Sequence, residues 1–313
     1  MEFRTKIKIP KSSFSISHQD KILLLGSCFT ENIGEYLLNY GFKVNINPFG
    51  IVYNPVSLFS GLDALIKKKN YTVDNLSKRN ELYFSFDHHG SFSDTNKDKI
   101  LTTINDHIER ASAHFIDSKF IIITLGTSYV YKHIAQNKLV ANCHKIPNTE
   151  FEKHLLTIEE IIEAFNLIKD KLKDKIILFT VSPVRHWRDG AVENQRSKSI
   201  LIESIHQLTE QNQNCFYFPA YEIMMDELRD YRFYEEDMIH PIAVAVKYIW
   251  EQFATTYFND TTAEINKQIS KGRLMYGHRT KHSDTAEEQD FSKQKLQFSE
   301  AFKTKFPDIE IDF

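Results

Sequence analysis

The chain has 313 residues but only 3 cysteines, 10 glycines and 8 prolines. The cysteines, Cys28, Cys143 and Cys215, are odd in number and have no CxxC spacing. This pattern argues against a disulfide framework and against a thiolate zinc site. So little glycine and proline excludes collagen-like and low-complexity chains. The cysteine usage suits a reducing compartment, and we expect the protein to be cytoplasmic.

Long apolar runs and an excess of one charge are also missing. No stretch approaches the ~20 apolar residues of a membrane span. The start, MEFRTKIKIPKSSFSISHQDK, lacks the apolar core of a secretory signal. Lys and Arg number 39 against 42 Asp and Glu, which gives a formal charge of −3. A nearly balanced surface predicts neither a nucleic-acid partner nor a membrane partner.

Apolar and aromatic residues are plentiful, at 42% and 13% of the chain, and suffice for a sizeable core. Short apolar runs that end in turn signals predict buried parallel strands: KILLLGS, FKVNINPFG, FIIITLGTS, KIILFTVSP and CFYFPAYEIM. Residues 96–115 and 157–174 instead place apolar side chains at helical spacing. The alternation predicts the α/β class: a three-layer α/β/α sandwich with a mostly parallel central sheet and flavodoxin-like layering.

The amino-acid composition changes near residue 259, where charged residues become more frequent and strand-forming residues become scarce. We therefore expect one domain over residues 1–258 and a charged, helical C-terminal appendage over residues 259–313. The appendage is predicted to hold one or two peripheral helices around a mobile linker, HRTKHSDTAEEQD.

The first predicted strand ends at Gly26 and Ser27. Ligands of open α/β sheets bind beyond the carboxyl ends of the strands, so Ser27 stands where chemistry is expected. A serine at a strand-to-helix turn can act as a nucleophile, with helix N–H groups nearby to stabilise an oxyanion, provided that a base activates it. It can equally be the N-cap of the following helix, a role for which serine is preferred. The residue alone leaves both roles open.

Asp237 and His240 lie three residues apart, just before an amphipathic helix. This spacing lets the carboxylate orient the imidazole, as in a serine hydrolase. Pro241 suits the first turn of that helix. A solvated aspartate beside a surface histidine is the alternative. The chain order Ser, Asp, His is also found in hydrolases.

Several motifs together resemble one known family: LGSCF, TLGTSYVY, VANCHKIP, VSPVRHWRDG and YFPAYEIMMDELRDYRFYEEDMIHP. They are similar to the GSCFA domain family, whose motif reads here Gly26-Ser27-Cys28-Phe29 with Thr30 in the last place. That family is in turn similar to the SGNH, or GDSL-like, hydrolases, which are α/β/α sandwiches that remove acyl groups from carbohydrates, lipids and other esters. The resemblance covers roughly residues 1–258.

The resemblance implies a serine-dependent acyl-ester hydrolase or acyltransferase without metal or organic cofactor. Its substrate would be an O-acylated carbohydrate or another small ester. Ser27 would be the nucleophile, His240 the general base and Asp237 its orienting partner. Ser27 Oγ and His240 are then expected within hydrogen-bond reach, about 2.6–3.2 Å.

The same resemblance implies an oxyanion hole. Its donors would be the N–H of Ser27, Gly50 after the second strand, and Ser128, which stands where the hydrolases have asparagine. A hydroxyl can donate one hydrogen bond. Asn142 could supply an amide instead.

Two loops hold further candidates for substrate binding. Arg185 and His186 follow the fourth predicted strand, where they could bind a sugar or an acidic group or form an ordinary polar loop. His88 and His89 lie in an insertion between the second strand and the next helix, and could contact substrate or belong to a surface loop.

Two rival functions remain. A binding module could keep the fold and hold a glycan or an envelope precursor at the same edge of the sheet. A flavodoxin-like nucleotide binder would share the layers, but no GxGxxG or GxxxxGK[ST] loop follows the first strand. Two weaker alternatives concern the cysteines. Cys28 could be a thiol nucleophile, and Cys143 with His144 could bind a metal, but packing roles are favoured for these residues.

Overall fold

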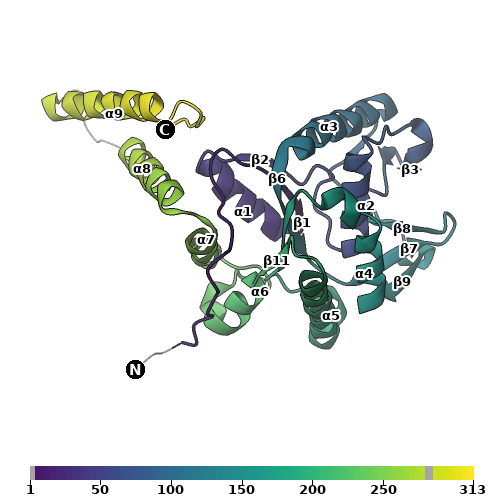
Figure 1. Cartoon of the computed structure of the whole chain (residues 1–313). Coiled ribbons are helices and arrows are strands. Elements are labelled where there is room, and N and C mark those ends of the chain that lie inside the picture. The colour runs from purple at the N-terminus through teal and green to yellow at the C-terminus, as the bar shows by residue number, and fades with distance from the viewer. Residues whose placement is uncertain (1–3, 279–284) are drawn as a thin grey trace.

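A five-stranded parallel sheet forms the centre of the computed structural model, which describes residues 4–278 and 285–313. The strands lie in the order β2 (Lys43–Ile46), β1 (Lys21–Gly26), β6 (Ser118–Leu125), β10 (Ile176–Val181) and β11 (Cys215–Phe218) (Figure 1). Each of the five predicted strands is confirmed. They form strands because apolar residues cover both faces, and Ile22 to Leu25 are almost completely buried.

Helices cover both faces of this sheet (Figure 1). Ile22 and Leu24 of β1 point to one core, and Leu23 and Leu25 point to the other, because side chains alternate along a strand. On the first face lie α1 (Cys28–Asn39), α6 (Ala220–Glu222) and α7 (Ala243–Tyr257); on the second lie α2 (Pro55–Ile66), α3 (Lys97–Asp117), α4 (Ile158–Asn166) and α5 (Gly190–Gln211). The predicted three-layer α/β/α sandwich is confirmed.

Two predicted helix boundaries differ from the structure. The helix expected over 157–174 begins as predicted, at an N-cap threonine with a capping box, but α4 ends at Asn166 and a 3₁₀ turn, Lys169–Leu172, follows. Pro241 was expected in the first turn of a helix, but α7 begins two residues later at Ala243, after the N-cap Ile242. Pro241 instead makes an isolated antiparallel bridge with Tyr234.

Two small antiparallel sheets were not predicted. They consist of β3 (Ser77–Arg79), β4 (Leu82–Phe84) and β5 (Ser93–Asp94), and of β7 (Tyr129–His133), β8 (Lys138–Val140) and β9 (Phe151–Leu155). Phe84, Phe86, Val140 and Phe151 form a shared core between them. The N–H of Ala141 also donates to the carbonyl oxygen of Phe86 at 2.8 Å, which joins the two insertions into one unit.

The C-terminal segment forms α8 (Asp260–Gly277) and α9 (Ala286–Lys305), beyond α7 and away from the sheet (Figure 1). A separate core unites them: Ile269, Phe302, Ile309 and Ile311, with Tyr40 of the main domain packed against it. Of the predicted linker over 278–290, residues 279–284 lie outside the described residues, and Ala286 to Asp290 begin α9. The predicted boundary at residue 258 stays a prediction.

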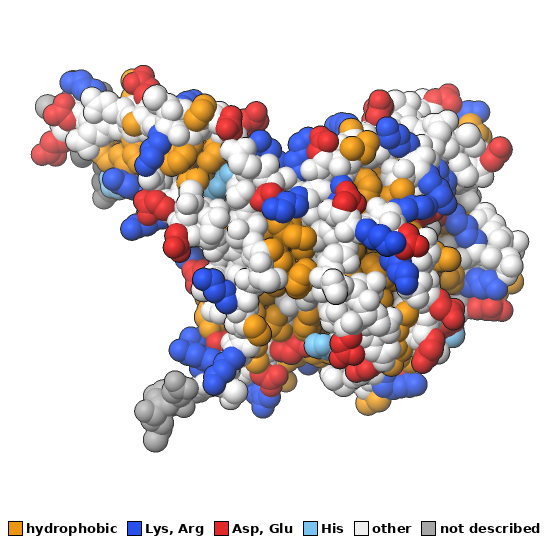
Figure 2. All heavy atoms as spheres, in the orientation of Figure 1, with side chains coloured by type: hydrophobic (Ala, Val, Ile, Leu, Met, Phe, Trp, Pro, Cys, Tyr) orange, Lys and Arg blue, Asp and Glu red, His pale blue; other side chains and the backbone are white. Residues whose placement is uncertain are grey.

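Basic and acidic side chains are interspersed over the face shown in Figure 2, with no large field of one sign. No helix among residues 4–278 and 285–313 is both long and apolar enough to cross a membrane.

Candidate active site

The chain reverses its order in the sheet between β1 and β6, because β2 lies on one side of β1 while β6, β10 and β11 follow on the other. In doubly wound sheets the ligand crevice opens at this switch point, beyond the carboxyl ends of the strands. Ser27 follows β1, and Gly126 to Ser128 follow β6. The residues singled out from the sequence therefore flank the place where a ligand is expected.

Ser27 is the N-cap of α1. Its backbone is extended (φ −72°, ψ 177°), its Oγ accepts the N–H of Phe29 at 3.3 Å, and its own N–H donates to the carbonyl oxygen of Thr124 at 3.2 Å. The predicted capping role is confirmed. The side chain is only 1% exposed. In this conformation a substrate has no open path to the hydroxyl.

Gly26 is required at the turn before Ser27. Its φ of +144° is open mainly to glycine, and an added Cβ would lie 2.3 Å from the carbonyl oxygen of Thr124. The side chain of Asn47, after β2, accepts the N–H of Gly26 at 2.8 Å. The strand-to-helix turn is thus held by both neighbouring strands.

Asp237 and His240 form the pair that their spacing suggested. Asp237 Oδ2 lies 2.6 Å from His240 Nδ1, and Oδ1 accepts the N–H groups of Ile239 and His240 at 2.8 and 3.0 Å. These hydrogen bonds, led by the backbone N–H of His240, lower the pKa of Asp237 to about 2. The ionised carboxylate therefore accepts a hydrogen bond from Nδ1–H, which leaves Nε2 as the acceptor nitrogen of the neutral ring. Both side chains are about half exposed.

The hydrogen bond expected between Ser27 Oγ and His240 is not formed in the described part of the chain. The loop that holds His240 is nevertheless attached to the same edge of the sheet. Arg185, in the loop after β10, donates through Nη2 to the carbonyl oxygen of Met238 at 3.2 Å. Its guanidinium also lies 5.3 Å from the ring centre of Tyr234. The loop is closed on itself by the N–H of Glu235, which donates to the His240 carbonyl oxygen at 2.7 Å.

The three residues considered for the oxyanion hole besides Ser27 are engaged elsewhere. The N–H of Gly50 donates to the carbonyl oxygen of Asn47 at 2.7 Å. Ser128 is fully buried, and its hydroxyl contacts Ser197 of α5, 3.1 Å from Oγ and 3.3 Å from the carbonyl oxygen. Asn142 accepts the N–H of His144 through Oδ1 and lines a pocket with His89 rather than with Ser27. Their roles as donors stay predictions that require a different arrangement.

The histidines of the insertion occupy different environments. His88 is fully buried, and neither ring nitrogen has a hydrogen-bond partner among the residues that the structure describes. Burial lowers the pKa of His88 to about 3, so the ring is neutral at physiological pH. It packs against the rings of Phe49, Tyr71 and Phe92, beyond the reach of a substrate. His89 is half-buried, and its Nδ1 pairs with Ser91 Oγ at 3.0 Å.

The loop after β10 presents an aromatic side chain to solvent beside a half-buried arginine. Trp187 is 46% exposed, and the Arg185 guanidinium lies 5.1 Å from its ring centre. His186 is half-buried, 3.6 Å from the carboxylate of Asp189. Burial lowers the pKa of His186, and the negative charge of Asp189 opposes this effect. The arrangement is compatible with sugar stacking on Trp187.

Lys198 of α5 is a feature of this edge that sequence reasoning missed. It is fully buried, and its Nζ donates to the carbonyl oxygens of Gly126 and Ser182, at 2.8 Å each. These carbonyls follow β6 and β10, so one ammonium group holds the ends of two strands together. Burial lowers the pKa of Lys198 to about 7. Burial also raises the pKa of the Cys28 thiol, and the charge of Lys198 opposes this rise.

A signal for Lys198 does exist in the sequence. The buried apolar face of α5 consists of Leu201, Ile205 and Leu208, and extending its helical spacing towards the N-terminus reaches Asn194, Ser197 and Lys198. All three are buried, although they are polar or charged. Polar residues that continue the buried apolar face of a helix indicate a polar site between that helix and the sheet on which it packs.

Metal binding by Cys143 and His144 has no support in the arrangement of side chains. Burial raises the pKa of Cys143 to about 11, which disfavours the thiolate that binds metals. His144 Nε2 faces the carbonyl oxygens of Ser85 and His88 at 3.0 and 3.1 Å. Within residues 4–278 and 285–313, no three His, Cys, Asp or Glu side chains gather as a metal-binding group.

Comparison with known proteins supports the motif-based assignment. A profile of the GSCFA family matches residues 21–253, which include Ser27, Lys198 and the Asp237–His240 pair. The matched segment begins with β1 and ends within α7, so it spans the complete central sheet. A comparison with curated proteins finds no match. On the family match, which covers most of the chain, this protein belongs to the GSCFA family.

Proposed function

We propose that the protein is a serine-dependent acyl-ester hydrolase of SGNH type, with Ser27 as nucleophile and His240 as general base. The observation that supports this most directly is the Asp237–His240 pair. Two backbone N–H groups hold the Asp237 carboxylate, and its 2.6 Å contact with Nδ1 favours the imidazole tautomer protonated there. Nε2 has no hydrogen-bond partner among the described residues and is available as a base.

The reaction would proceed through an acyl-serine. His240 Nε2 takes the proton of the Ser27 hydroxyl while Oγ attacks the ester carbonyl, and the resulting imidazolium is stabilised by the Asp237 carboxylate. Collapse of the tetrahedral intermediate breaks the bond to the alcohol, which receives the proton from His240. Water then attacks the acyl-serine with His240 again as base, and this step releases the carboxylic acid and restores Ser27.

This mechanism requires a rearrangement of the site. Ser27 is 1% exposed and caps α1, so its hydroxyl must turn away from the Phe29 N–H and meet His240. The loop of residues 234–241 is held by its own hydrogen bonds and by Arg185, and it moves as a unit in our proposal. Substrate-induced closure of loops commonly completes a catalytic arrangement in this way.

The substrate class that we propose is an O-acylated carbohydrate or a related small ester. Trp187, 46% exposed on the loop after β10, offers a face on which a sugar ring can stack. An acyltransferase would use the same acyl-serine, with a second alcohol in place of water. The two reactions differ in which nucleophile reaches the acyl group.

A non-catalytic binding module is the second candidate, and the burial of Ser27 favours it. The Ser27 N–H and the Gly50 N–H donate to backbone carbonyls, and the Ser128 hydroxyl contacts Ser197. A site that never rearranges would hold a glycan at the edge of the sheet without breaking a bond.

Ester hydrolysis distinguishes the two candidates. We would measure kcat/KM on p-nitrophenyl acetate and acetate release from acetylated oligosaccharides, for the wild type and for Ser27→Ala and His240→Ala. If the protein is a hydrolase, kcat/KM should fall by about 10³-fold or more in both variants. Glu236→Gln, an exposed change of charge in the same loop, should stay within about twofold. Oligosaccharide binding without any turnover, unchanged in Ser27→Ala, would establish the binding module instead.

A further inference from the structure

The pocket lined by Asn142 and His89 has a volume of about 520 Å³ and lies between the two small sheets and the loop of residues 88–93. Pockets of this size hold small organic ligands. It is lined by residues from both insertions, among them Arg79, Leu82, Ser93, Asn142, His144 and Lys145. The lining includes two basic side chains, Arg79 and Lys145, and no carboxylate.

Neither cation of this pocket has a carboxylate partner in the described part of the chain. Arg79 donates one hydrogen bond, from Nη1 to the carbonyl oxygen of His144 at 3.1 Å, and the exposed Lys145 is in no ion pair there. The guanidinium therefore retains N–H donors for a ligand. Two uncompensated positive charges around a concave surface attract an anion.

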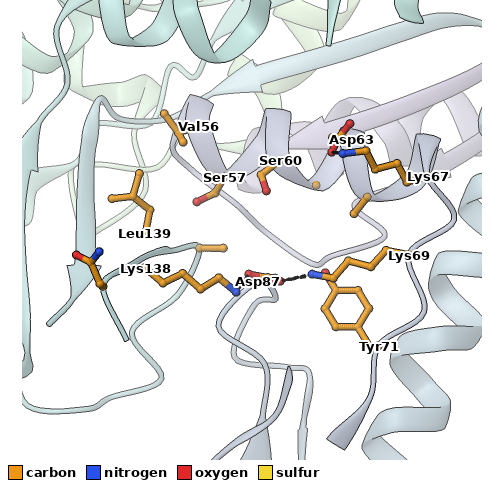
Figure 3. A pocket seen from close by; sticks show the side chains of 14 residues that line it. Val56, Ser57, Ser60, Asp63, Lys67, Lys69, Tyr71, Asp87, Lys138 and Leu139 are labelled. Carbon is orange, nitrogen blue, oxygen red and sulfur yellow. Dashed lines mark hydrogen bonds and ion pairs between the residues drawn. The ribbon is translucent and has the colours of Figure 1, made fainter. Parts of the chain in front are cut away.

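Another pocket, of about 600 Å³, provides a contrast (Figure 3). There Lys69 and Lys138 converge on Asp87, at 3.1 and 2.5 Å, and Lys67 pairs with Asp63 at 2.5 Å. Each of these three lysines is therefore paired with a carboxylate of the protein. The two basic side chains of the other pocket have no such partner among the described residues.

The cationic pocket is also rigid on one side. The imidazole of His144 stacks on Phe84, with ring centres 4.1 Å apart, and its Nε2 faces the carbonyl oxygens of Ser85 and His88. This fixes the position of the next residue, Lys145. Both residues have positive φ values, 47° and 58°, a conformation that only well-held residues other than glycine adopt.

We propose that this pocket binds a small organic molecule through an oxyanion group, a phosphate or a carboxylate, held between Arg79 and Lys145. Arginine can hold such groups with two parallel hydrogen bonds, and lysine adds a point charge. The half-buried Asn142 and Ser93 offer further polar atoms, and Leu82, 45% exposed, offers an apolar surface for the rest of the ligand.

The pocket adjoins the loop that follows β2. The N–H of His89 donates to the carbonyl oxygen of Phe49 at 2.8 Å, and a Cβ on Gly50 would lie 2.4 Å from that of His89. A ligand in the pocket would therefore contact His89, whose backbone is bonded to the loop after β2 at the edge of the central sheet. The binding proposal itself does not depend on whether Ser27 reacts.

Titration calorimetry on the full-length protein at low ionic strength tests the proposal. The probes are inorganic phosphate, glucose 6-phosphate and glucuronate, with glucose as the uncharged reference. The two sugar derivatives distinguish a phosphate from a carboxylate. We expect at least one anion to bind with a Kd below about 10 mM, and glucose not to bind. No binding of any of the three anions in this range would overturn the proposal.

Variants locate the site. Arg79→Gln and Lys145→Gln should each weaken binding by about tenfold, the size expected for one charge-assisted contact. Lys78→Gln is the matched control: it removes one positive charge from the same strand β3, at a residue outside the pocket lining. It should leave Kd within about twofold. Circular dichroism of each variant confirms folding, and Arg79→Lys replaces Arg79→Gln if that variant is unfolded. Equal loss in Lys78→Gln, or no loss in either pocket variant, would contradict the assignment.

Discussion

Replacing Lys198 by methionine should change how the stability of the protein depends on pH. The side chain is fully buried, and its Nζ contacts only the carbonyl oxygens of Gly126 and Ser182 within hydrogen-bond distance in the described residues. Methionine is unbranched and of similar length, so Lys198→Met removes the titrating group with little change of volume. A neutral change on the exposed side of the same helix, Ser199→Ala, serves as the control.

The magnitude follows from the pKa. Burial lowers the pKa of Lys198 from the ordinary 10.5 to about 7. At about 1.4 kcal/mol for each pH unit, the full difference amounts to about 5 kcal/mol. The unfolded chain binds this proton more readily than the folded chain, so protonation of Lys198 destabilises the folded state. This destabilisation is absent above the pKa of the unfolded state and complete below the pKa of the folded state. Between pH 7 and pH 9 the free energy of unfolding of the wild type should therefore rise by about 2 kcal/mol relative to Lys198→Met.

Urea unfolding at pH 6, 7, 8 and 9, followed by circular dichroism and by tryptophan fluorescence, measures this difference. Coincident transitions from the two probes justify the use of a single free energy. The Ser199→Ala curve should run parallel to that of the wild type. If the Lys198→Met curve is also parallel, within about 0.5 kcal/mol over this range, then Lys198 does not titrate as a buried group and the reasoning is refuted.

Two further predictions concern the turn at β1 and the histidine loop. Gly26→Ala should prevent cooperative folding or cost more than about 3 kcal/mol, because its φ is +144° and the new Cβ would lie 2.3 Å from the Thr124 carbonyl oxygen; thermal unfolding measures this. Gly90→Ala, whose Cβ would meet no atom within 4 Å, should change stability by about 1 kcal/mol at most. Asp237→Asn should alter the tautomer of His240, because the carboxylate that accepts from Nδ1 is lost. Nitrogen-15 NMR of the imidazole detects this, and an unchanged tautomer would show that the pair is not coupled.

The central sheet could be predicted because its signal is local. Runs such as residues 22–25 and 120–123 are apolar on both faces and are followed closely by small or polar residues, which leaves few alternatives to a buried parallel strand. The two small sheets could not be predicted in the same way. Their strands have two to five residues, mix charged with aromatic side chains, and owe their stability to a core shared between segments about 60 residues apart.

In the candidate site, too, only the local arrangement could be predicted from the sequence. Asp237 and His240 lie three residues apart, so a single turn places them together and the sequence suffices. The relation of His240 to Ser27 depends on how a loop packs across the edge of the sheet, which no spacing encodes. Lys198 could not be predicted for a different reason: a lysine in a helix is usually solvated, and only the packing of α5 on β10 and β11 buries it.

The measurement that tests the central claim most directly is labelling with a fluorophosphonate probe at neutral pH, read by intact mass and peptide mapping. Our account predicts one adduct per chain, located on Ser27, absent in Ser27→Ala and formed at least about 10²-fold more slowly in His240→Ala. Folded wild-type protein that remains unlabelled, or an adduct on any other residue, would contradict the assignment of Ser27 as an activated nucleophile.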